Sequence, residues 1–296
     1  MQFHVDGELV AEENATVSVR DRGFAYGDGL FETLRAYGGT VFAWERHADR
    51  LERGAERLGM ADALPPREDL RGRLVETLSG NDLDDAYLKL TVSRGVQPGK
   101  LTPDPEVDPT VVVQARPLAR GGREGDPVYD GPAVVQSVKT RRVPNAARPA
   151  DAKTLNYLDG VLARLELRRA ATEEFAADEA LLRDVDGYVA EGATSNLFFV
   201  DDGVLKTPTT DQSVLPGVTR SIVLELAEKE EFPVETGRYE IGDVRDADEA
   251  FLTNATWELR PVASVDGIEV GRGPMTALLS RLYDERVERV CYADGA

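Results

Sequence analysis

The sequence predicts an α/β (α+β) protein of two domains, in which short strands alternate with a few helices. The chain has 296 residues, and single domains typically run to about 100–200 residues. Hydrophobic residues make up 42% of it, which is enough for a substantial core. Apolar residues recur at helical spacing in some segments and alternate as in strands in others.

The first part of the chain combines strand patterns with two predicted helices. The strand-like runs FHVDGELV and TVSVRDRG precede the Gly-rich piece AYGDGLFETLRAY. A helix is predicted over about 45–59, because small or apolar residues recur every three or four positions from Ala48 to Leu58. A second helix is predicted over about 67–79, and AYLKLTVSRG alternates like a strand.

The segment PLARGGREGDP at 117–127 is the best domain boundary. It combines Gly, Pro and charge, has no apolar period, and follows the strand-like run VVVQA. The prediction is therefore an N-terminal domain over 1–117, a linker over 118–127 and a C-terminal domain over 128–296.

Strands dominate the second part of the chain. Tight Asp-Gly turns separate the apolar runs EALLRD, YVAEGATSNLFFV and VLKTP, which predicts antiparallel hairpins. LPGVTRSIVLELAEKE begins a helix, and EAFLTNATWELRPVASVDG returns to strand. The chain also enters a helix directly after Lys153, with its apolar face predicted at Leu155, Leu158, Leu162 and Leu165.

Charge and composition argue against several classes of partner. The net charge is −19, from 54 acidic and 35 basic residues, and such a field repels nucleic-acid phosphate and anionic membranes. One cysteine and two histidines argue against a disulfide framework and a metal site. We see neither a long apolar run nor a signal-peptide pattern, so a cytoplasmic location is expected.

LPGVTR at 215–220 is a candidate phosphate site. Pro216 and Gly217 precede a helix whose first-turn N–H groups have no partner within the helix, and the Thr219 hydroxyl can add a donor. A routine helix start gives the same pattern, so this motif does not decide the function by itself.

Lys153 and Glu191 are candidates for cofactor chemistry. A Schiff-base lysine needs an amine that can lose its proton, and pyridoxal phosphate needs a carboxylate to keep its ring nitrogen protonated. Glu191, in VAEGATSN, follows a strand and enters a tight turn, so its side chain can project from the end of the sheet. Each residue alone also fits a surface charge, but together with LPGVTR they favour a pyridoxal-phosphate site.

Six motifs give the chain a resemblance to the class IV aminotransferase family, the fold-type IV pyridoxal-phosphate enzymes. They are DRGFAYGDGLFETLRAY, FAWERHADRL, AKTLNYLDGVLARLE, DEALLRDVDGYVAEGATSNLFFV, LPGVTR and DEAFLTNATWELRPV. The resemblance implies a small N-terminal α/β domain and a larger, barrel-like C-terminal domain with the cofactor between them. It also implies a homodimer, in which N-terminal loops of one subunit complete the neighbour's pocket.

The resemblance implies a role for each matched residue. Lys153 would hold the cofactor covalently and move protons at the substrate carbons, and Glu191 would pair with the pyridine nitrogen. Arg50, in HADRL, would bind the phosphate with its guanidinium. The other implied cofactor contacts are Asn196 beside the ring, Val218 and Thr219 at the helix end, Asn254, Ala255 and Thr256 in TNATWE, and Tyr157, whose match requires a one-residue gap.

Within the family, the spacing of KTLN resembles both the D-amino-acid and the aminodeoxychorismate branches. LKLTVSRG and the asparagine in TNATWELRPV look most like 4-amino-4-deoxychorismate lyase, which releases pyruvate to give 4-aminobenzoate, and FETLR is also frequent in that branch. Branched-chain enzymes typically show FEGIR and Tyr-x-Arg, where this chain has FETLR and Tyr87-x-Lys89. A transaminase of branched-chain or D-amino acids that uses 2-oxoglutarate stays open, as does a non-catalytic pyridoxal-phosphate-binding protein. For a small-molecule substrate, the candidate contacts are Arg94, Phe31 and Lys89.

Strong surface acidity is also how proteins from a high-salt cytoplasm stay solvated, so we expect the protein to be halophilic. Its activity and its Tm should rise as KCl is increased from dilute buffer to molar concentration. Full activity and an unchanged Tm in dilute buffer would contradict this expectation.

Overall fold

The computed structural model describes residues 1–121, 128–173, 176–211, 213–271 and 273–292, which divide into two compact units. Unit 1 comprises Met1–Arg120, Asp151–Asn156 and Val287–Ala296, and unit 2 comprises Gly121–Ala150 and Tyr157–Arg286. The sequence-based division differs from this, because it assigns residues 151–156 and the C-terminus to the second domain. Most of the predicted linker over 118–127 lies outside the described residues.

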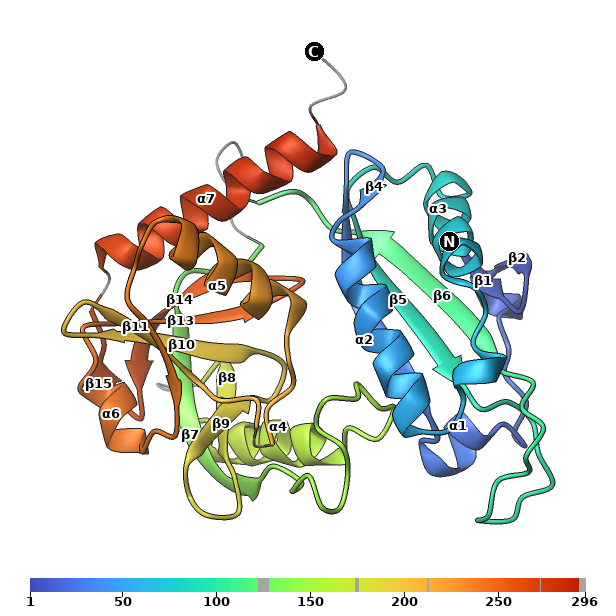
Figure 1. The fold of residues 1–296 in the computed structure, drawn as a ribbon, viewed down its shortest axis with the longest axis horizontal. Helices are drawn as coiled ribbons and strands as arrows, with labels where there is room; N and C mark the ends of the chain where they lie inside the picture. The colour runs from blue at the N-terminus through green and yellow to red at the C-terminus, as the bar shows by residue number, and fades with distance from the viewer. Residues whose placement is uncertain (122–127, 174–175, 212, 272, 293–296) are drawn as a thin grey trace. The chain divides into compact units, whose positions relative to one another are not determined.

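Unit 1 is built on a six-stranded antiparallel sheet in the order β2-β1-β6-β5-β3-β4 (Figure 1). Its strands are β1 (Gln2–Val5), β2 (Glu8–Ala11), β3 (Gly29–Tyr37), β4 (Thr40–Val41), β5 (Ala86–Ser93) and β6 (Val111–Pro117). Its helices are α1 (Arg22–Tyr26), α2 (Trp44–Arg57) and α3 (Arg67–Ser79), with short 3-10 turns at Glu12–Asn14 and Ala61–Ala63. Helices α2 and α3 confirm the two helices predicted in this part.

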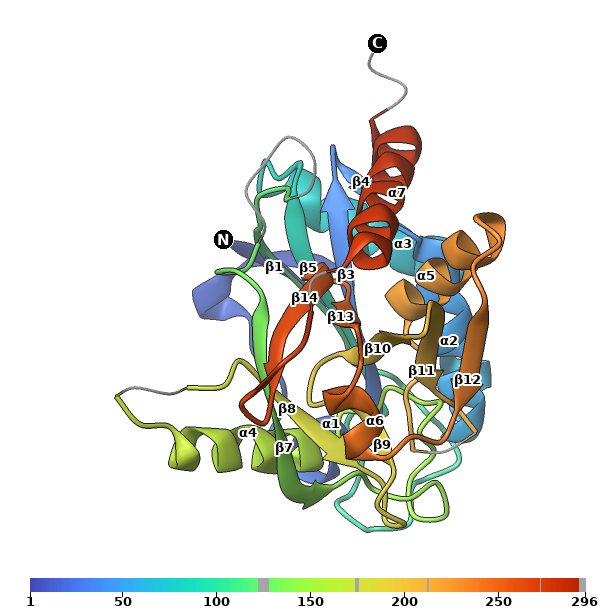
Figure 2. The ribbon, with the colours of Figure 1, turned by 90° about the vertical axis from the view of Figure 1, so that its left-hand side faces the viewer.

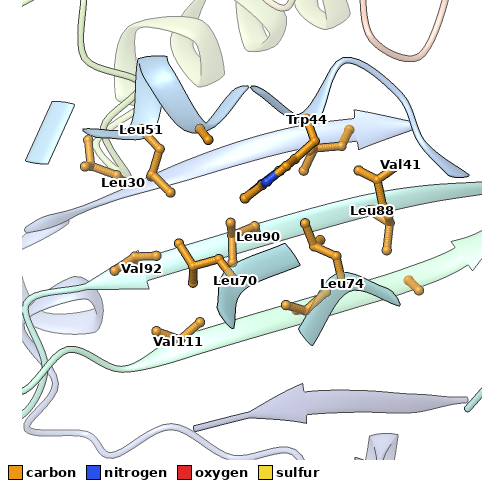
Figure 3. Packing of buried hydrophobic residues seen from close by; sticks show 14 of the residues in the cluster. Leu30, Val41, Trp44, Leu51, Leu70, Leu74, Leu88, Leu90, Val92 and Val111 are labelled. Carbon is orange, nitrogen blue, oxygen red and sulfur yellow. The ribbon is translucent and has the colours of Figure 1, made fainter. Parts of the chain in front are cut away.

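Helices α2 and α3 pack on this sheet through their apolar residues (Figure 3). Trp44 and Leu51 of α2 and Leu70 and Leu74 of α3 are each at most 4% exposed, and they share one cluster with Leu88 of β5. Burying one such side chain stabilises a fold by about 1.5–3 kcal/mol. The sheet of unit 1 is therefore a rigid base for the side chains at its ends.

Residues 153–155 pair with the start of β3. The Phe31 N–H donates to the Lys153 carbonyl at 2.9 Å, and the Leu155 N–H donates to the Gly29 carbonyl at 2.9 Å. A Cβ on Gly29 would lie 2.5 Å from the Val92 carbonyl oxygen of β5 and 2.9 Å from Leu155 Cδ1, so glycine permits both β5 and Leu155 to approach this closely. This pairing fixes the backbone of Lys153 to the sheet of unit 1.

Unit 2 contains a nine-stranded sheet in the order β12-β11-β10-β13-β14-β7-β8-β9, with β15 beside β14 (Figure 2). The strands are β7 (Ala133–Arg141), β8 (Glu179–Arg183), β9 (Val189–Gly192), β10 (Asn196–Asp201), β11 (Val204–Pro208), β12 (Val234–Gly237), β13 (Glu249–Asn254), β14 (Glu258–Val265) and β15 (Ile268–Glu269). The helices are α4 (Leu158–Ala170), α5 (Val218–Lys229), α6 (Ile241–Arg245) and α7 (Pro274–Cys291), whose last residues belong to unit 1.

The predicted Asp-Gly hairpins are present in unit 2. Strands β8 and β9, β10 and β11, and β14 and β15 are antiparallel pairs. Asp202 and Gly203 both have positive φ, of 49° and 75°, as a tight hairpin turn requires. Strand β7, in contrast, runs parallel to both β8 and β14.

The apolar face predicted for the helix after Lys153 is not the face that α4 buries. Helix α4 begins after Leu155, and Leu158 and Leu162 are 61% and 46% exposed. The residues of α4 that are buried are Asp159, Gly160, Ala163 and Leu167. Small residues allow α4 to approach β7 and β8 closely, so the larger leucines lie on the opposite face.

The described part of the chain has no helix that is both long enough and apolar enough to cross a membrane. Within the same residues, no group of His, Cys, Asp and Glu side chains is arranged to hold a metal ion.

Candidate functional site

Glu191, in β9, is buried and surrounded by donors of unit 2. Its Oε1 accepts from Arg142 Nη2 at 2.8 Å, and its Oε2 accepts from Asn196 Nδ2 and the Leu215 N–H at 3.0 Å each. A cationic partner and two hydrogen bonds favour the charged form of a carboxylate. A charged carboxylate suits the role that the resemblance implies for Glu191, which is to pair with a protonated ring nitrogen. That role and the implied contact of Asn196 with the ring stay predictions, and the structure adds a hydrogen bond between Asn196 and Glu191.

Arg142 connects Glu191 to Asp159, and the sequence analysis missed it. Arg142 is 4% exposed; its Nη1 donates to Asp159 Oδ2 at 2.5 Å and its Nε to the Ser213 carbonyl at 3.1 Å. Burial opposes its charge, but Glu191 and Asp159 outweigh burial and raise the pKa of Arg142. The pattern of polar and apolar residues does not show that this arginine is buried.

The N-terminus of α5 lies beside Glu191 and Asn196. Gly217 is the N-cap residue. It has no side chain, so no side-chain acceptor caps the N–H groups of the first turn. A Cβ at Gly217 would lie 1.9 Å from Asn196 Oδ1, so only glycine fits there. Val218 and Thr219 are buried and begin the helix. First-turn N–H groups beside a fixed carboxylate fit the phosphate and the ring nitrogen of pyridoxal phosphate.

Asn254 organises the turn of TNATWE at the end of β13. Its Oδ1 accepts from the N–H groups of Thr256 and Trp257 at 2.9 and 2.7 Å, and its Nδ2 donates to the Thr194 carbonyl at 3.3 Å. The turn, with Ala255 and Thr256, is thereby tied to the residues that follow Glu191. The phosphate contacts of Asn254, Ala255 and Thr256 stay predictions.

In unit 1, Lys153, Phe31 and Lys89 lie together. Lys153 Nζ is 4.3 Å and Lys89 Nζ 5.2 Å from the centre of the Phe31 ring. Lys89 is half-buried; burial lowers its pKa, and repulsion from Lys153 and Arg116 lowers it further. The structure thus brings three of the predicted residues to one place, with two amines on one aromatic ring.

Arg50, on α2, is 4% exposed and held by Glu32. Its Nε donates to Glu32 Oε1 at 2.8 Å and its Nη2 to Glu32 Oε2 at 2.5 Å, and His47 Nδ1 donates to Glu32 Oε2 at 2.7 Å. Glu32 thereby fixes the direction of the guanidinium. Phosphate binding by Arg50 stays a prediction.

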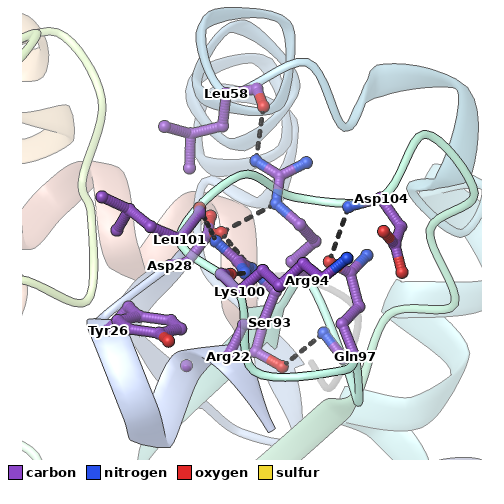
Figure 4. Close-up of polar contacts among 12 residues, drawn as sticks. Arg22, Tyr26, Asp28, Leu58, Ser93, Arg94, Gln97, Lys100, Leu101 and Asp104 are labelled. Carbon is purple, nitrogen blue, oxygen red and sulfur yellow. Dashed lines mark hydrogen bonds and ion pairs between the residues drawn. The ribbon is translucent and has the colours of Figure 1, made fainter.

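Arg94 belongs to a different cluster of unit 1, shown in Figure 4. Its Nε donates to Asp28 Oδ2 at 2.8 Å and its Nη2 to the Leu58 carbonyl at 2.6 Å, and Arg22 Nε donates to the same Asp28 oxygen at 2.8 Å. This geometry favours a structural role over the predicted contact with a substrate carboxylate, which stays a prediction.

Tyr157 is the N-cap residue of α4, in unit 2, and the Arg148 guanidinium lies 5.9 Å from its ring centre. Lys153, four residues earlier, belongs to unit 1. A contact of Tyr157 with the cofactor stays a prediction.

A lysine amine, a donor-bound carboxylate and a helix N-terminus are the groups that a pyridoxal-phosphate enzyme needs. The family model described as "Amino-transferase class IV" matches residues 29–265, and the chain belongs to this family. The predicted family, enzyme class and cofactor are therefore confirmed.

Named relatives cover almost the whole chain. It is 37% identical to a "Putative branched-chain-amino-acid aminotransferase" of Methanocaldococcus jannaschii, over 96% of this chain and 95% of that protein. It is 32% identical to a D-alanine aminotransferase of Listeria monocytogenes, over 98% of each. The solved 4-amino-4-deoxychorismate lyase of Pseudomonas aeruginosa superposes with a TM-score of 0.81 at 32% identity, over 98% of this chain and 100% of that one, which confirms the predicted fold class.

We expect Glu32→Gln to remove an acid-sensitive part of the stability. Burial alone would raise the pKa of Glu32, but Arg50 and His47 outweigh it and lower the pKa from 4.5 to about 2. A carboxyl group with a lowered pKa stabilises the fold at any pH above its unfolded-state pKa. This stabilisation, about 3 kcal/mol for the shift of Glu32, is lost as the pH falls through the folded-state pKa. The difference in unfolding free energy between the wild type and Glu32→Gln should be constant near neutral pH and shrink between about pH 4.5 and pH 2.

Urea unfolding at a series of pH values measures this difference, with the exposed Glu8→Gln as the control. A difference that does not change with pH would contradict the expectation.

Proposed function

We propose that the protein is an aminotransferase that moves an amino group between an α-amino acid and a 2-oxo acid. The observation that carries this proposal is the similarity to the aminotransferase of M. jannaschii, which is 37% identical over 96% of the chain. The D-alanine aminotransferase of L. monocytogenes supports the same class of reaction. Substrates of both kinds have an α-carboxylate, which the ammonium group of Lys89 suits by charge.

Each candidate residue then has a defined task. Bound pyridoxal phosphate supplies an electron sink that stabilises negative charge at the substrate α-carbon. Lys153 would bind the cofactor and take the proton from the substrate Cα. Glu191, oriented by Arg142 and Asn196, would hold the proton on the ring nitrogen. The Arg50 guanidinium and the first turn of α5 would bind the phosphate.

Lys89 is the candidate for the substrate carboxylate. Lys89 lies in β5, which pairs with the strand of Phe31, β3. Its amine lies over the Phe31 ring and is partly removed from water. A carboxylate binds more strongly to an ammonium group in such surroundings than in bulk water. A strand-surface lysine fully in water would give much less binding energy.

A 4-amino-4-deoxychorismate lyase is the second candidate. The motifs LKLTVSRG and TNATWE and the likeness to the P. aeruginosa enzyme favour it, while KTLN is shared with the D-amino-acid branch. However, two residues of LKLTVSRG have tasks in the fold: Ser93 Oγ donates to Asp21 Oδ2 at 2.7 Å, and Arg94 binds Asp28. Part of this motif is therefore explained by the fold, so the motif is weaker evidence for the lyase substrate.

The test offers the enzyme leucine or D-alanine with 2-oxoglutarate, and separately aminodeoxychorismate. We expect an oxo acid from at least one amino-acid pair, and Lys153→Ala should lower the rate by about 10²–10⁴-fold, as removal of a general base does. Formation of 4-aminobenzoate from aminodeoxychorismate, without turnover of either pair, would overturn the proposal in favour of the lyase.

We also infer that two copies of the chain form a dimer through the face around α1. Phe24 and Leu101 are 75% and 79% exposed, and α1 is tied to the loop that carries Leu101: Arg22 Nη2 donates to the Leu101 carbonyl at 2.9 Å (Figure 4), and Tyr26 Oη donates to the Gly99 carbonyl at 2.8 Å. Exposed apolar side chains that gather on one face are typical of a contact surface. A second copy is the partner that the family resemblance implies for these N-terminal loops.

Light scattering should therefore give twice the chain mass for the wild type. Phe24→Glu together with Leu101→Glu should shift the protein to the monomer, because two charges would be buried in the interface. Val185→Asp, in an exposed turn of unit 2, is the control and should leave the mass unchanged. A monomeric wild type would contradict the inference.

A further inference from the structure

Glu179, the first residue of β8, is a completely buried carboxyl group without a task in the proposed reaction. Its Oε1 accepts from the N–H groups of Ala180 and Ala193, at 3.0 Å each. Its Oε2 accepts from the Thr194 hydroxyl at 2.5 Å. A buried carboxyl group is tolerated only with such partners.

Two of these donors belong to the turn 192–195, which joins β9 to β10. The turn is closed by the Gly192 N–H, which donates to the Ser195 carbonyl at 2.7 Å. Glu191 precedes the turn directly and Asn196 follows it, and the two side chains are hydrogen-bonded to each other. Strand pairing holds Glu191 in β9 and Asn196 in β10, and the turn between them helps to set how the two side chains meet.

The turn has little room to move against Glu179. A Cβ on Gly192 would lie 3.1 Å from Glu179 Cγ and 2.2 Å from Ser195 Oγ. On the other side, Asn254 Nδ2 holds the Thr194 carbonyl. The turn is thus fixed between the Glu179 side chain and the end of β13.

The anchoring does not depend on the charge of Glu179. Burial raises the pKa of Glu179, while Thr194, the backbone donors and Arg164, whose Nη1 is 3.8 Å from Oε1, act in the opposite direction. Oε1 can accept its two backbone N–H groups in either protonation state. A glutamine at this position would keep the same acceptor.

We propose that Glu179 is a positioning residue that, through the turn 192–195, directs the Glu191 carboxylate toward the ring nitrogen of pyridoxal phosphate. The inference rests on the proposed role of Glu191.

The test compares Glu179→Leu and Glu179→Gln with a matched control, Glu249→Leu. Glu249 is also buried, and it accepts from two backbone N–H groups and the Thr276 hydroxyl. It pairs with Val200, at the end of β10 opposite to Asn196. Both leucine variants therefore lose the same kind of hydrogen bonds, but only one of them lies beside the turn.

Three properties are measured: the Tm, the affinity for pyridoxal phosphate by titration, and amide hydrogen exchange of the holoenzyme. Exchange is followed at residues 191–196 and at the Leu215 N–H, which donates to Glu191. Glu179→Leu removes the acceptor of three hydrogen bonds, so it should raise exchange at both places and weaken cofactor affinity, each by about tenfold or more, since about tenfold corresponds to the loss of one net hydrogen bond. Glu179→Gln should stay close to the wild type. Glu249→Leu should lower the Tm without changing either of the other two properties.

Wild-type exchange at Leu215 and wild-type cofactor affinity in Glu179→Leu, with a lowered Tm alone, would overturn the proposal. If that variant does not fold, Thr194→Val removes a single donor and should change both properties in the same direction by a smaller factor; no change would again overturn the proposal.

The role of Glu191 is tested separately, by Glu191→Gln. Unchanged cofactor affinity and turnover in that variant would refute the proposed role, while the exchange at Leu215 would still report on the positioning by Glu179.

Discussion

Two main-chain hydrogen bonds between residues 153–155 and the start of β3 are the constraint on which the candidate chemistry depends. They attach Lys153 to a sheet whose core is closed by α2 and α3, although more than 100 residues separate the two segments in the chain. The backbone of Lys153 is therefore held against the sheet, and its amine has the Phe31 ring and Lys89 as neighbours. The carboxylate that the same chemistry needs, Glu191, is held independently in unit 2.

Each unit contains a buried arginine–glutamate pair, Arg50 with Glu32 and Arg142 with Glu191. Such a pair need not stabilise the fold more than well-packed apolar side chains of the same size would, because the loss of hydration offsets much of its attraction; removing one partner is costly, because the other charge is then left buried alone. These pairs fix the orientation of the side chains. A guanidinium held at two nitrogens, or a carboxylate held by three donors, can face a ligand in only one way. Catalysis with a bound cofactor requires that the few reacting groups are held in a fixed geometry.

Much of the fold and of the candidate site could be predicted from the sequence. Helical spacing located α2 and α3, Asp-Gly pairs located the hairpins, and ordered motifs identified the family. The buried polar residues Arg142 and Glu179 could not be found, because periodicity does not show which charges a sheet covers. For the same reason, the leucines of α4 were assigned to the buried face, although Gly160 and Ala163 provide the contact. The pairing of Lys153 with β3 is a long-range contact that local patterns cannot predict.

Reduction of the pyridoxal-phosphate-loaded enzyme with borohydride, followed by peptide mass spectrometry, tests the assignment of Lys153 most directly. Reduction fixes the cofactor to the amine that holds it. We expect the phosphopyridoxyl group on Lys153 alone. A label on Lys89 or on any other lysine, with Lys153 unmodified, would contradict the assignment.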